Sequence, residues 1–308
     1  MLPTPKFHHL HLKSTDPDAA IAFYTKQFRS TSKGSWGGFA ALKSPNDVMV
    51  LFEKVDRPPT SEPQSAIWHF GWHVRDSRRS LETYKNRPEV ELLPLYTSEE
   101  GGSVLISSDT WPGQGGVLGL TKAQIAEAKR KGLGPAGGGG FAYMKGPDDA
   151  LVEYAGDHPA ERFNHVHLYQ EDPFCAQLWY QKHLNAPPRA GWGGAPMNDA
   201  EDCKVPRGAD RTWPALNREG MFRSPRAGVE FGDVALIWYA NQDEEPLAGS
   251  RCQLQDHIAL SVTDLDAWID KLRGENVTFL EQPYILGDTR AVMIEGPSRE
   301  ALELVEIK

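Results

Sequence analysis

The sequence predicts an α+β fold built from four copies of one unit, in which a strand and a helix are followed by about three further strands. Three observations support this prediction. Residues 7–28 and 163–184 match without gaps at 9 of 22 positions. Short apolar runs separated by Gly and Pro follow each copy. A His-x6-Asp pattern recurs at His9/Asp16, His69/Asp76, His165/Asp172 and His257/Asp264. Self-similarity of this kind indicates a repeat architecture.

Each unit is predicted to begin with a strand that leads into a helix. Apolar residues alternate around His257 with the period of a strand, whereas those from Leu265 to Leu272 have the i, i+3, i+4, i+7 spacing of a helix. The Asp of each His-x6-Asp pattern lies between these two elements, where its carboxylate can accept from the first free amide groups of the helix. We therefore expect every such Asp to be a helix N-cap.

The remainder of each unit is predicted to be strand. The candidate strands are residues 37–44, 46–55, 90–96, 102–108, 140–146, 150–156, 227–233, 234–241, 277–283, 289–296 and 301–308. Two longer segments, 107–140 and 191–226, interrupt the pattern. The first contains a predicted helix at 121–132, with Thr121 as N-cap and Gly132 as terminator. Long segments of this type are either lids or unconstrained loops.

The composition excludes several classes of protein. The 308 residues, 40% hydrophobic and 24% charged, suffice for two globular domains. A net charge of -9 without basic runs argues against a nucleic-acid partner. The chain has neither a signal-like start nor an apolar run long enough for a membrane span, so we expect a cytoplasmic protein with no membrane partner. Cys175, Cys203 and Cys252 have no C-x-x-C spacing, which predicts three buried or incidental thiols.

Acidic residues in the last strands indicate a bound cation. Two units end in Gly-Pro-x5-Glu, at Gly146 to Glu153 and at Gly296 to Glu303. Burying an unpaired carboxylate costs several kcal/mol, so these residues need a positive partner. Two imidazoles and one carboxylate form the facial arrangement that holds Fe(II) or Mn(II) with open positions. Sequence order gives the metal sets His9/His69/Glu153 and His165/His257/Glu303, and Glu53 is a possible fourth ligand or a solvated charge.

These motifs resemble the vicinal oxygen chelate superfamily, which includes glyoxalase I, extradiol dioxygenases and fosfomycin and bleomycin resistance proteins. The resemblance covers almost the whole chain apart from the two long segments. It implies that βαβββ units pair into cup-shaped mixed sheets, with a metal ion between the first-strand His residues and the closing Glu. We expect two such domains, residues 1–158 with units 1 and 2, and residues 159–308 with units 3 and 4. A chain of four units resembles the extradiol dioxygenases. A pair of units that supplies two His and two Glu ligands resembles bacterial glyoxalase I.

The chain departs from the extradiol pattern in its acid-base residues. Those enzymes carry a His shortly before a Tyr that leads into the Pro-Gly turn. Met293 stands in that Tyr position in unit 4, and Tyr143 matches it in unit 2, but neither copy has the His. Other histidines two or four residues after a ligand share its strand face. His11, His73, His167 and Tyr143 are therefore the catalytic candidates, and a buried polar role is equally open for the histidines. Tyr24, Tyr84 and Tyr180 recur on the helices, where we expect packing.

The sequence leads to three hypotheses for function. The first is a metal-dependent enzyme acting on a small substrate with adjacent oxygens, with a preference for an Fe(II) dioxygenase. The second is a glyoxalase-like isomerase or lyase that uses Ni, Zn or Mn. The third is a metal-free binding or resistance protein, in which the same polar residues satisfy one another. The expected partner is a small-molecule substrate, and the sequence leaves a homo-oligomer open.

Overall fold

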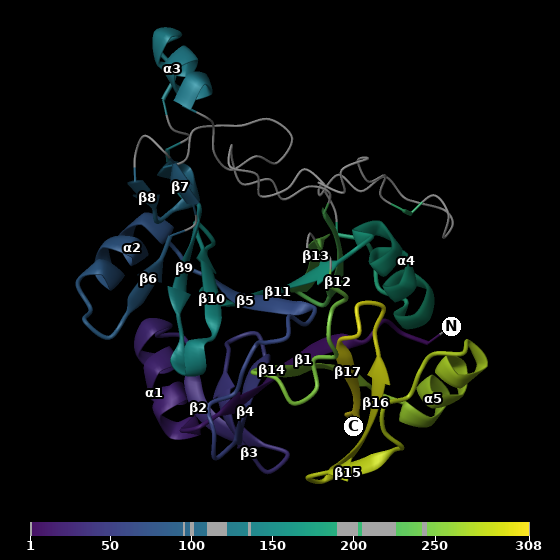
Figure 1. Cartoon of the computed structure of the whole chain (residues 1–308). Coiled ribbons are helices and arrows are strands. Elements are labelled where there is room, and N and C mark those ends of the chain that lie inside the picture. The colour runs from purple at the N-terminus through teal and green to yellow at the C-terminus, as the bar shows by residue number, and fades with distance from the viewer. Residues whose placement is uncertain are drawn as a thin grey trace.

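The computed structural model describes residues 2–94, 96–98, 102–109, 122–134, 137–189, 203–204, 226–241 and 245–307 (Figure 1). Unit 1 contains β1 (Lys6–Ser14), α1 (Pro17–Gln27), β2 (Ser32–Trp36), β3 (Phe39–Lys43) and β4 (Met49–Lys54). Unit 2 contains β5 (Ile67–His73), α2 (Ser77–Lys85), β6 (Glu91–Leu93), β9 (Phe141–Lys145), the short 3-10 helix η2 (Pro147–Asp149) and β10 (Leu151–Ala155). Its insertion adds β7 (Tyr96–Ser98), β8 (Gly102–Val104), the 3-10 helix η1 (Ser107–Asp109) and α3 (Lys122–Arg130).

The second half of the chain repeats this order. Unit 3 contains β11 (Arg162–Gln170), α4 (Pro173–Leu184), β12 (Arg226–Phe231) and β13 (Val234–Ala240). Unit 4 contains β14 (Gln255–Val262), α5 (Leu265–Gly274), β15 (Tyr284–Leu286), β16 (Thr289–Glu295) and β17 (Ala301–Glu306). The predicted α+β fold of four βαβββ-like units in two mixed sheets is confirmed, with unit 3 represented by two named strands after its helix.

The two sheets combine units from opposite halves of the chain. Sheet 1 has the order β15-β16-β17-β14-β1-β4-β3-β2 and joins units 1 and 4. Sheet 2 has the order β12-β13-β11-β5-β10-β9-β6 and joins units 2 and 3. The sheets therefore do not follow the expected division into residues 1–158 and 159–308, because β1 pairs with β14 and β5 with β11. All four first strands carry the same alternating pattern, so the pattern does not distinguish one partner from another.

Both central pairings are antiparallel and have the same register. His11 lies opposite His257 in sheet 1, and His167 lies opposite His69 in sheet 2. Each pair of strands also has two register shifts, one on either side of the paired histidines. The four first strands thus form two equivalent antiparallel pairs, one at the middle of each sheet.

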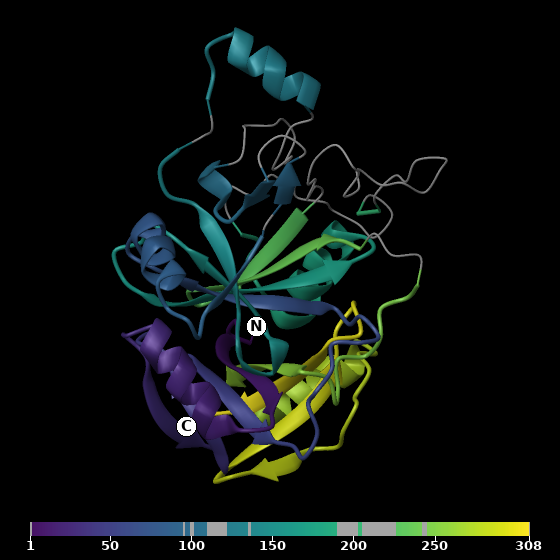
Figure 2. The same cartoon turned by 60° about the vertical axis from the view of Figure 1, so that its left-hand side comes forward.

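The hydrophobic core lies between the two sheets. Leu10 and Ile258 of sheet 1 belong to the same buried cluster as Phe70 and Val166 of sheet 2. Figure 2 shows the two sheets as stacked layers, with their helices at the sides. Because neighbouring residues of a strand face opposite ways, His9 and His11 point away from this core. Smaller clusters line the faces that carry the histidines, and sheet 1 is lined by Ala41, Met49, Leu51, Ala259, Ala291 and Val305.

The predicted helix caps are confirmed at three units. The Asp16, Asp76 and Asp264 carboxylates accept from the amide groups of Ala19, Arg79 and Ala267 at 2.8 to 3.0 Å. Asp172 holds the same N-cap position before α4. The helix expected at 121–132 is present as α3, and Gly132 follows it with a φ of 68°. Thr121 and most of the segment 191–226 lie outside the described residues.

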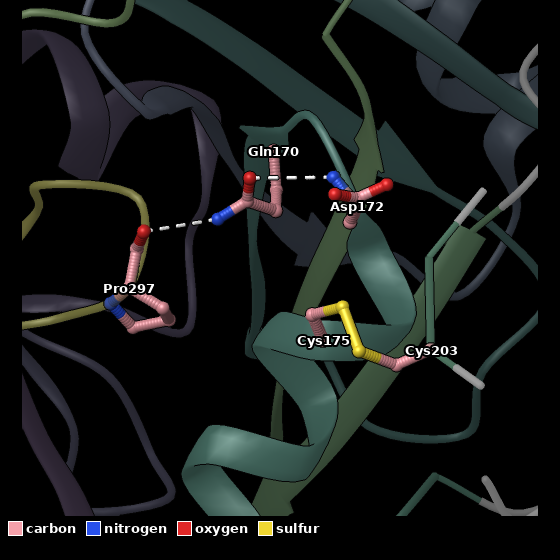
Figure 3. Close-up of a disulfide and its surroundings, with 5 residues drawn as sticks. All are labelled: Gln170, Asp172, Cys175, Cys203 and Pro297. Atoms are coloured by element: carbon pink, nitrogen blue, oxygen red, sulfur yellow. Dashed lines mark hydrogen bonds between the residues drawn. A yellow bond between two sulfur atoms is a disulfide. The ribbon is translucent and has the colours of Figure 1, made fainter. Parts of the chain in front are cut away.

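A disulfide joins Cys175 of α4 to Cys203, which corrects the prediction of three incidental thiols (Figure 3). The spacing of 28 residues gave no sign of this bond, since only the fold brings Cys203 to the first turn of α4. Cys252 is a free, exposed cysteine. In the same region Gln170 donates to the carbonyl oxygen of Pro297 at 3.0 Å, which connects the end of β11 to the last turn of unit 4.

None of the described helices has both the length and the apolar composition that a membrane-spanning helix needs.

Candidate metal centres

Two clusters of buried histidine and glutamate side chains lie on the faces turned away from the common core. Site 1, on sheet 1, consists of His9, His11, His257 and Glu303. Site 2, on sheet 2, consists of His165, His167, His69 and Glu153. The predicted metal sets combined the same residues differently. The His and Glu of unit 2 are exchanged with those of unit 4, because each sheet takes one unit from each half of the chain.

Site 1 brings three ring nitrogens and a carboxylate into a small buried volume. The Nε2 atom of His9 lies 3.4 Å from Oε2 of Glu303, and Nε2 of His257 lies 3.7 Å from the same oxygen. One ring nitrogen from each of His9, His11 and His257 lies within 4.8 Å of the other two. The rings of His11 and His257 are stacked, with centroids 4.5 Å apart.

Site 2 repeats this geometry with one more residue in the close group. The Oε2 atom of Glu153 lies 3.1 Å from Nε2 of His69 and 3.8 Å from Nδ1 of His167. Its Oε1 atom lies 3.7 Å from Nε2 of His165. One ligand atom from each of these four residues lies within 4.8 Å of all the others. The twofold repeat of the fold is therefore also a repeat of the site.

Sheet register places the two carboxylates. Glu303 lies beside Ala259 and Glu153 beside Gly71, each two residues after the first-strand His of its own unit. The small residue leaves room above the strand for the carboxylate and for the imidazole that comes from the other unit. The facing pair in sheet 2 is His165 and Gly71, and the facing pair in sheet 1 is His9 and Ala259.

Glu53 lies on the same face as site 1 but beyond it. Leu51, beside His11, occupies the register position that corresponds to Glu303, and Glu53 comes two residues later, roughly 7 Å further along the strand. Its Oε2 atom is 2.6 Å from Nζ of Lys13 and 3.9 Å from Nε2 of His11. Its side chain is 42% exposed. The structure thus places Glu53 with Lys13 and apart from His9 and His257. The matching residue of site 2 is Tyr239, whose ring centroid lies 5.1 Å from that of His167.

Burial lowers the pKa of His9, His11 and His165 and so favours their neutral forms. Burial, together with the neighbouring His257, His8 and His11, lowers the pKa of His9 well below 6.5. Burial also lowers the pKa of His165 to about 3, although Glu153 opposes this shift. His257 differs, because its contacts with Asp256 and Glu303 outweigh the effect of burial and raise its pKa. Neutral imidazole and ionised carboxylate are the forms that bind a metal ion.

The donor atoms at site 1 fit a metal ion. His9 Nε2, His11 Nε2, His257 Nε2 and Glu303 Oε2 are buried and have no hydrogen-bond partner. Leaving a buried polar atom unsatisfied costs about 1 to 3 kcal/mol. Imidazole and carboxylate donors in this proportion suit Fe(II), Mn(II) or Zn(II). A divalent cation bound to His9, His257 and Glu303 would satisfy three of these four atoms.

The catalytic candidates divide into two groups. His11 and His167 lie within the sites, and Tyr143 lies beside site 2, with its ring centroid 5.0 Å from that of His69. Burial, followed by the nearby His257, lowers the pKa of His11 well below 6.5. His73 lies on the site 2 face at the end of β5, where its ring stacks on His158 at 4.4 Å. The structure therefore does not bring His73 into the cluster.

Three residues next to site 1 had not been identified from the sequence. Asp256 contacts Nδ1 of His257 at 2.7 Å, His8 Nδ1 lies 2.8 Å from His9 Nδ1, and Tyr284 donates to Oε1 of Glu303. Asp256 precedes a predicted ligand directly, so an acidic residue adjacent to the His was the available signal. Tyr284 lies on an edge strand 19 residues before Glu303 and gave none.

The solved structures that resemble the fold of this chain include a plant glyoxalase I. No family model matches the sequence, and no curated protein matches it. Glyoxalase I from Zea mays has a TM-score of 0.61 at 15% identity, covering 98% of this chain and 92% of its own. A variant of that enzyme gives 0.58 at 16% identity, covering 98% of this chain and 92% of that one. A candidate dioxygenase from Bacillus subtilis gives 0.56 at 10% identity, covering 99% of this chain and 86% of its own. Together with the paired βαβββ units, this likeness shows that the chain has a glyoxalase-like fold.

Proposed function

We propose that the chain is a metal-dependent enzyme that acts on a small substrate with two adjacent oxygen atoms. His9, His257 and Glu303 are the ligands at site 1. His165, His69 and Glu153 are the ligands at site 2. The observation that carries the proposal is the convergence, twice in one chain, of buried imidazole nitrogens on a single buried carboxylate. At site 1 the facing atoms have no hydrogen-bond partner, which supports a bound cation over a metal-free binding protein.

The number of carboxylates favours an Fe(II) dioxygenase over a glyoxalase-like enzyme. A set of two imidazoles and one carboxylate is the facial arrangement of non-haem Fe(II) oxygenases. Glu53, which would complete a set of two His and two Glu, is bonded to Lys13 instead. The fold alone supports either reaction, since both the maize glyoxalase I and the bacterial candidate dioxygenase share it. A glyoxalase-like isomerase or lyase remains the second proposal.

The protein residues have separate roles in this proposal. An Fe(II) ion would supply a Lewis-acid centre with open positions for the two substrate oxygens and for molecular oxygen. His11 is a proton acceptor at site 1, because its buried ring is neutral at pH 7 and its Nε2 atom has no partner. His167 and Tyr143 have the corresponding positions at site 2. Trp36, whose ring centroid is 5.4 Å from that of His9, helps to exclude water from site 1.

Metal content tests the proposal directly. We expect protein purified without added metal, or reloaded anaerobically with Fe(II), to hold one ion at each site. His257→Ala and Glu303→Ala should each abolish binding at site 1 alone, and His69→Ala and Glu153→Ala at site 2 alone, because each removes one ligand. Glu53→Gln is the matched control and should retain both ions.

The possible results separate the proposals. Loss of the site 1 ion in Glu53→Gln, together with bound Ni or Zn, would favour the glyoxalase-like alternative. Absence of stoichiometric metal from the wild-type protein, even after reloading, would contradict both metal-dependent proposals and favour a metal-free binding protein.

A further inference from the structure

The site 1 ligands are held from behind by neighbouring side chains. His8, Asp256 and Tyr284 contact, in turn, His9 Nδ1, His257 Nδ1 and Glu303 Oε1. In every case the neighbour contacts the ligand atom that faces away from the cluster. Three atoms face the cluster and remain available to bind a metal ion: His9 Nε2, His257 Nε2 and Glu303 Oε2. The arrangement resembles an outer layer that orients each ligand toward a common point.

The contact between Asp256 and His257 fixes the tautomer of the imidazole. Oδ1 of Asp256 lies 2.7 Å from Nδ1 of His257. An ionised carboxylate can only accept, so Nδ1 carries the proton and Nε2 keeps its lone pair toward the cluster. Nη1 of Arg251 lies 3.3 Å from the same Nδ1 but bonds more closely to the Asp256 oxygen.

Asp256 is itself fixed in the buried position that this role requires. Its Oδ1 atom accepts from Arg251, and its Oδ2 atom accepts from the amide of Cys252 at 2.7 Å. Nζ of Lys13 lies 3.6 Å from Oδ2. Arg251 is held in turn by Glu281 at 2.8 Å. A carboxylate with two cations and an amide around it stays ionised and immobile, although it is only 1% exposed.

The corresponding positions of site 2 carry different residues. Trp68 precedes His69 where Asp256 precedes His257, and Asn164 precedes His165 where His8 precedes His9. Neither replacement is an ionisable group, and Trp68 offers no acceptor oxygen in its side chain. The two sites share their ligand geometry but differ in the residues behind it.

We infer that Asp256 is a positioning residue for His257, and that it makes site 1 the tighter of the two metal sites. This inference rests on the proposed function, because it assumes that both clusters bind a divalent ion. It adds an order in which the two sites bind metal. When there are fewer metal ions than sites, site 1 is occupied first.

Substituting Asn for Asp256 is a sharp test because the surrounding donors dictate the amide orientation. The amide group of Cys252 and Nζ of Lys13 both lie at the Oδ2 position, so we expect the Asn oxygen to stay there, and Arg251 then loses its acceptor at the Oδ1 position. The Asn NH2 group then faces Nδ1 of His257, which has to accept. The ring proton moves to Nε2, the atom that would bind the metal. The side-chain volume is unchanged, so a loss of affinity cannot be attributed to a cavity.

Titration with Co(II) of the full-length, chelator-treated protein tests the inference. His69→Ala leaves site 1 as the intact site, and His257→Ala leaves site 2. We expect Co(II) to bind more tightly to His69→Ala. Adding Asp256→Asn to His69→Ala should weaken binding by about 10- to 100-fold, the usual effect of losing an outer partner of a ligand. Adding Glu281→Gln is the charge-matched control, and it should change the affinity less than about threefold because the Glu281 side chain is 42% exposed.

A spectroscopic measurement separates positioning from general stabilisation. In metal-free protein at alkaline pH, 15N spectra of the histidine rings should place the His257 proton on Nδ1, and in Asp256→Asn on Nε2, with His257→Ala identifying the signals. If Asp256→Asn fails to fold, Tyr284→Phe is the substitute variant. It removes the hydroxyl group that contacts Glu303 and should weaken metal binding at site 1.

Each outcome bears on a defined claim. Tighter Co(II) binding by His257→Ala than by His69→Ala overturns the order of loading. Equal affinity loss in Asp256→Asn and Glu281→Gln, or an unchanged His257 tautomer, overturns the positioning role while leaving the proposed function intact. Absence of Co(II) binding at both sites overturns the proposed function and this inference together.

Discussion

The imidazole of His165 lies directly over the α-carbon of Gly71 on the neighbouring strand. A β-carbon added to Gly71 would lie 2.2 Å from Cε1 and 2.4 Å from Nε2 of His165. Such distances are far below van der Waals contact, so the ring occupies its place only because residue 71 has no side chain. In sheet 1 the pair in the same register is His9 and Ala259, where a methyl group is present.

Gly71→Ala is expected to displace the His165 ring and to weaken metal binding at site 2 by at least about tenfold, since one of its ligands is moved. Site 1 should keep its affinity. Ala259→Gly is the matched control in sheet 1, where it removes a methyl group and adds no clash. Metal titration of both variants gives the measurement. Unchanged binding at site 2 in Gly71→Ala would show that His165 is not a ligand.

Tyr24 and Tyr180 occupy equivalent helix positions but should respond differently to the loss of their hydroxyl groups. Tyr180 donates to Oε1 of the buried Glu300 at 2.6 Å, whereas the buried Tyr24 hydroxyl has no hydrogen-bond partner, and Ala150 replaces Glu300 in unit 2. Tyr180→Phe should lower the free energy of unfolding by about 1 to 3 kcal/mol, because it leaves a carboxylate oxygen unsatisfied. Tyr24→Phe should be neutral or stabilising. Chemical denaturation compares the two, and equal losses would contradict this account.

Glu300 should make stability depend on pH. Burial raises the pKa of this carboxyl from 4.5 to about 7, although bonds from Tyr180 and from the amide of Ser298 oppose the shift. A raised carboxyl pKa means that the folded state retains the proton. The stabilisation is complete below about pH 4.5 and is lost as the pH rises through about 7, an effect of about 3 kcal/mol. The stability of Glu300→Gln should therefore rise relative to that of the wild type as the pH increases from 5 to 8.

The measurement for this prediction is the free energy of unfolding of both proteins at several pH values. The exposed Asp270 on α5 provides a control, because Asp270→Asn removes a carboxyl that remains in water. Stability profiles that run parallel for the wild type and Glu300→Gln would refute the titration of Glu300 in this range.

The Cys175–Cys203 bond should be detectable by thiol counting. Native, non-reduced protein is expected to react at Cys252 alone, and peptide mapping should recover Cys175 linked to Cys203. Reduction, or Cys203→Ser, should lower the free energy of unfolding by about 3 kcal/mol, because the bond closes a loop of 28 residues in the unfolded chain. Cys252→Ser is the control. Disulfides are rare in cytosolic proteins, so three reactive thiols would contradict the bond and agree with the cytoplasmic location expected from the sequence.

The sequence was most informative where chemistry is local. Three Asp caps, which depend on residues three positions away, were predicted correctly, and the glutamates that follow the Gly-Pro turn were correctly expected to be buried beside histidines. Strand partners were not predictable, because a fourfold repeat offers each first strand several equivalent neighbours. His73 illustrates a second limit. A period of two residues assigns a side chain to a face, but four residues along a strand amount to roughly 13 Å.

Glu53 and Asp256 show the same limit in two ways. Glu53 was a possible ligand that lies beyond the site, and Asp256 was not predicted although it contacts His257. Glu53 lies in an apolar strand, as Glu153 and Glu303 do, and only the register with β1 shows that it lies two residues beyond the position that corresponds to Glu303. Asp256 adjoins a predicted ligand, yet neighbouring strand residues normally face apart, so its contact with His257 needed coordinates. Sequence patterns identified the residue types at the sites, and tertiary structure decided which of them meet.

The crossed pairing of units has a consequence for how the chain assembles. Units 2 and 3 are consecutive, so sheet 2 can form before unit 4 has left the ribosome. Strand β1 must wait for β14, whose residues pair with it across about 250 positions of chain, and contacts of such long range form slowly. Folding should thus proceed from the middle of the polypeptide outward. A fragment that ends at residue 158 would contain neither complete set of three metal ligands. The fragment from residue 159 onward would contain no complete set either.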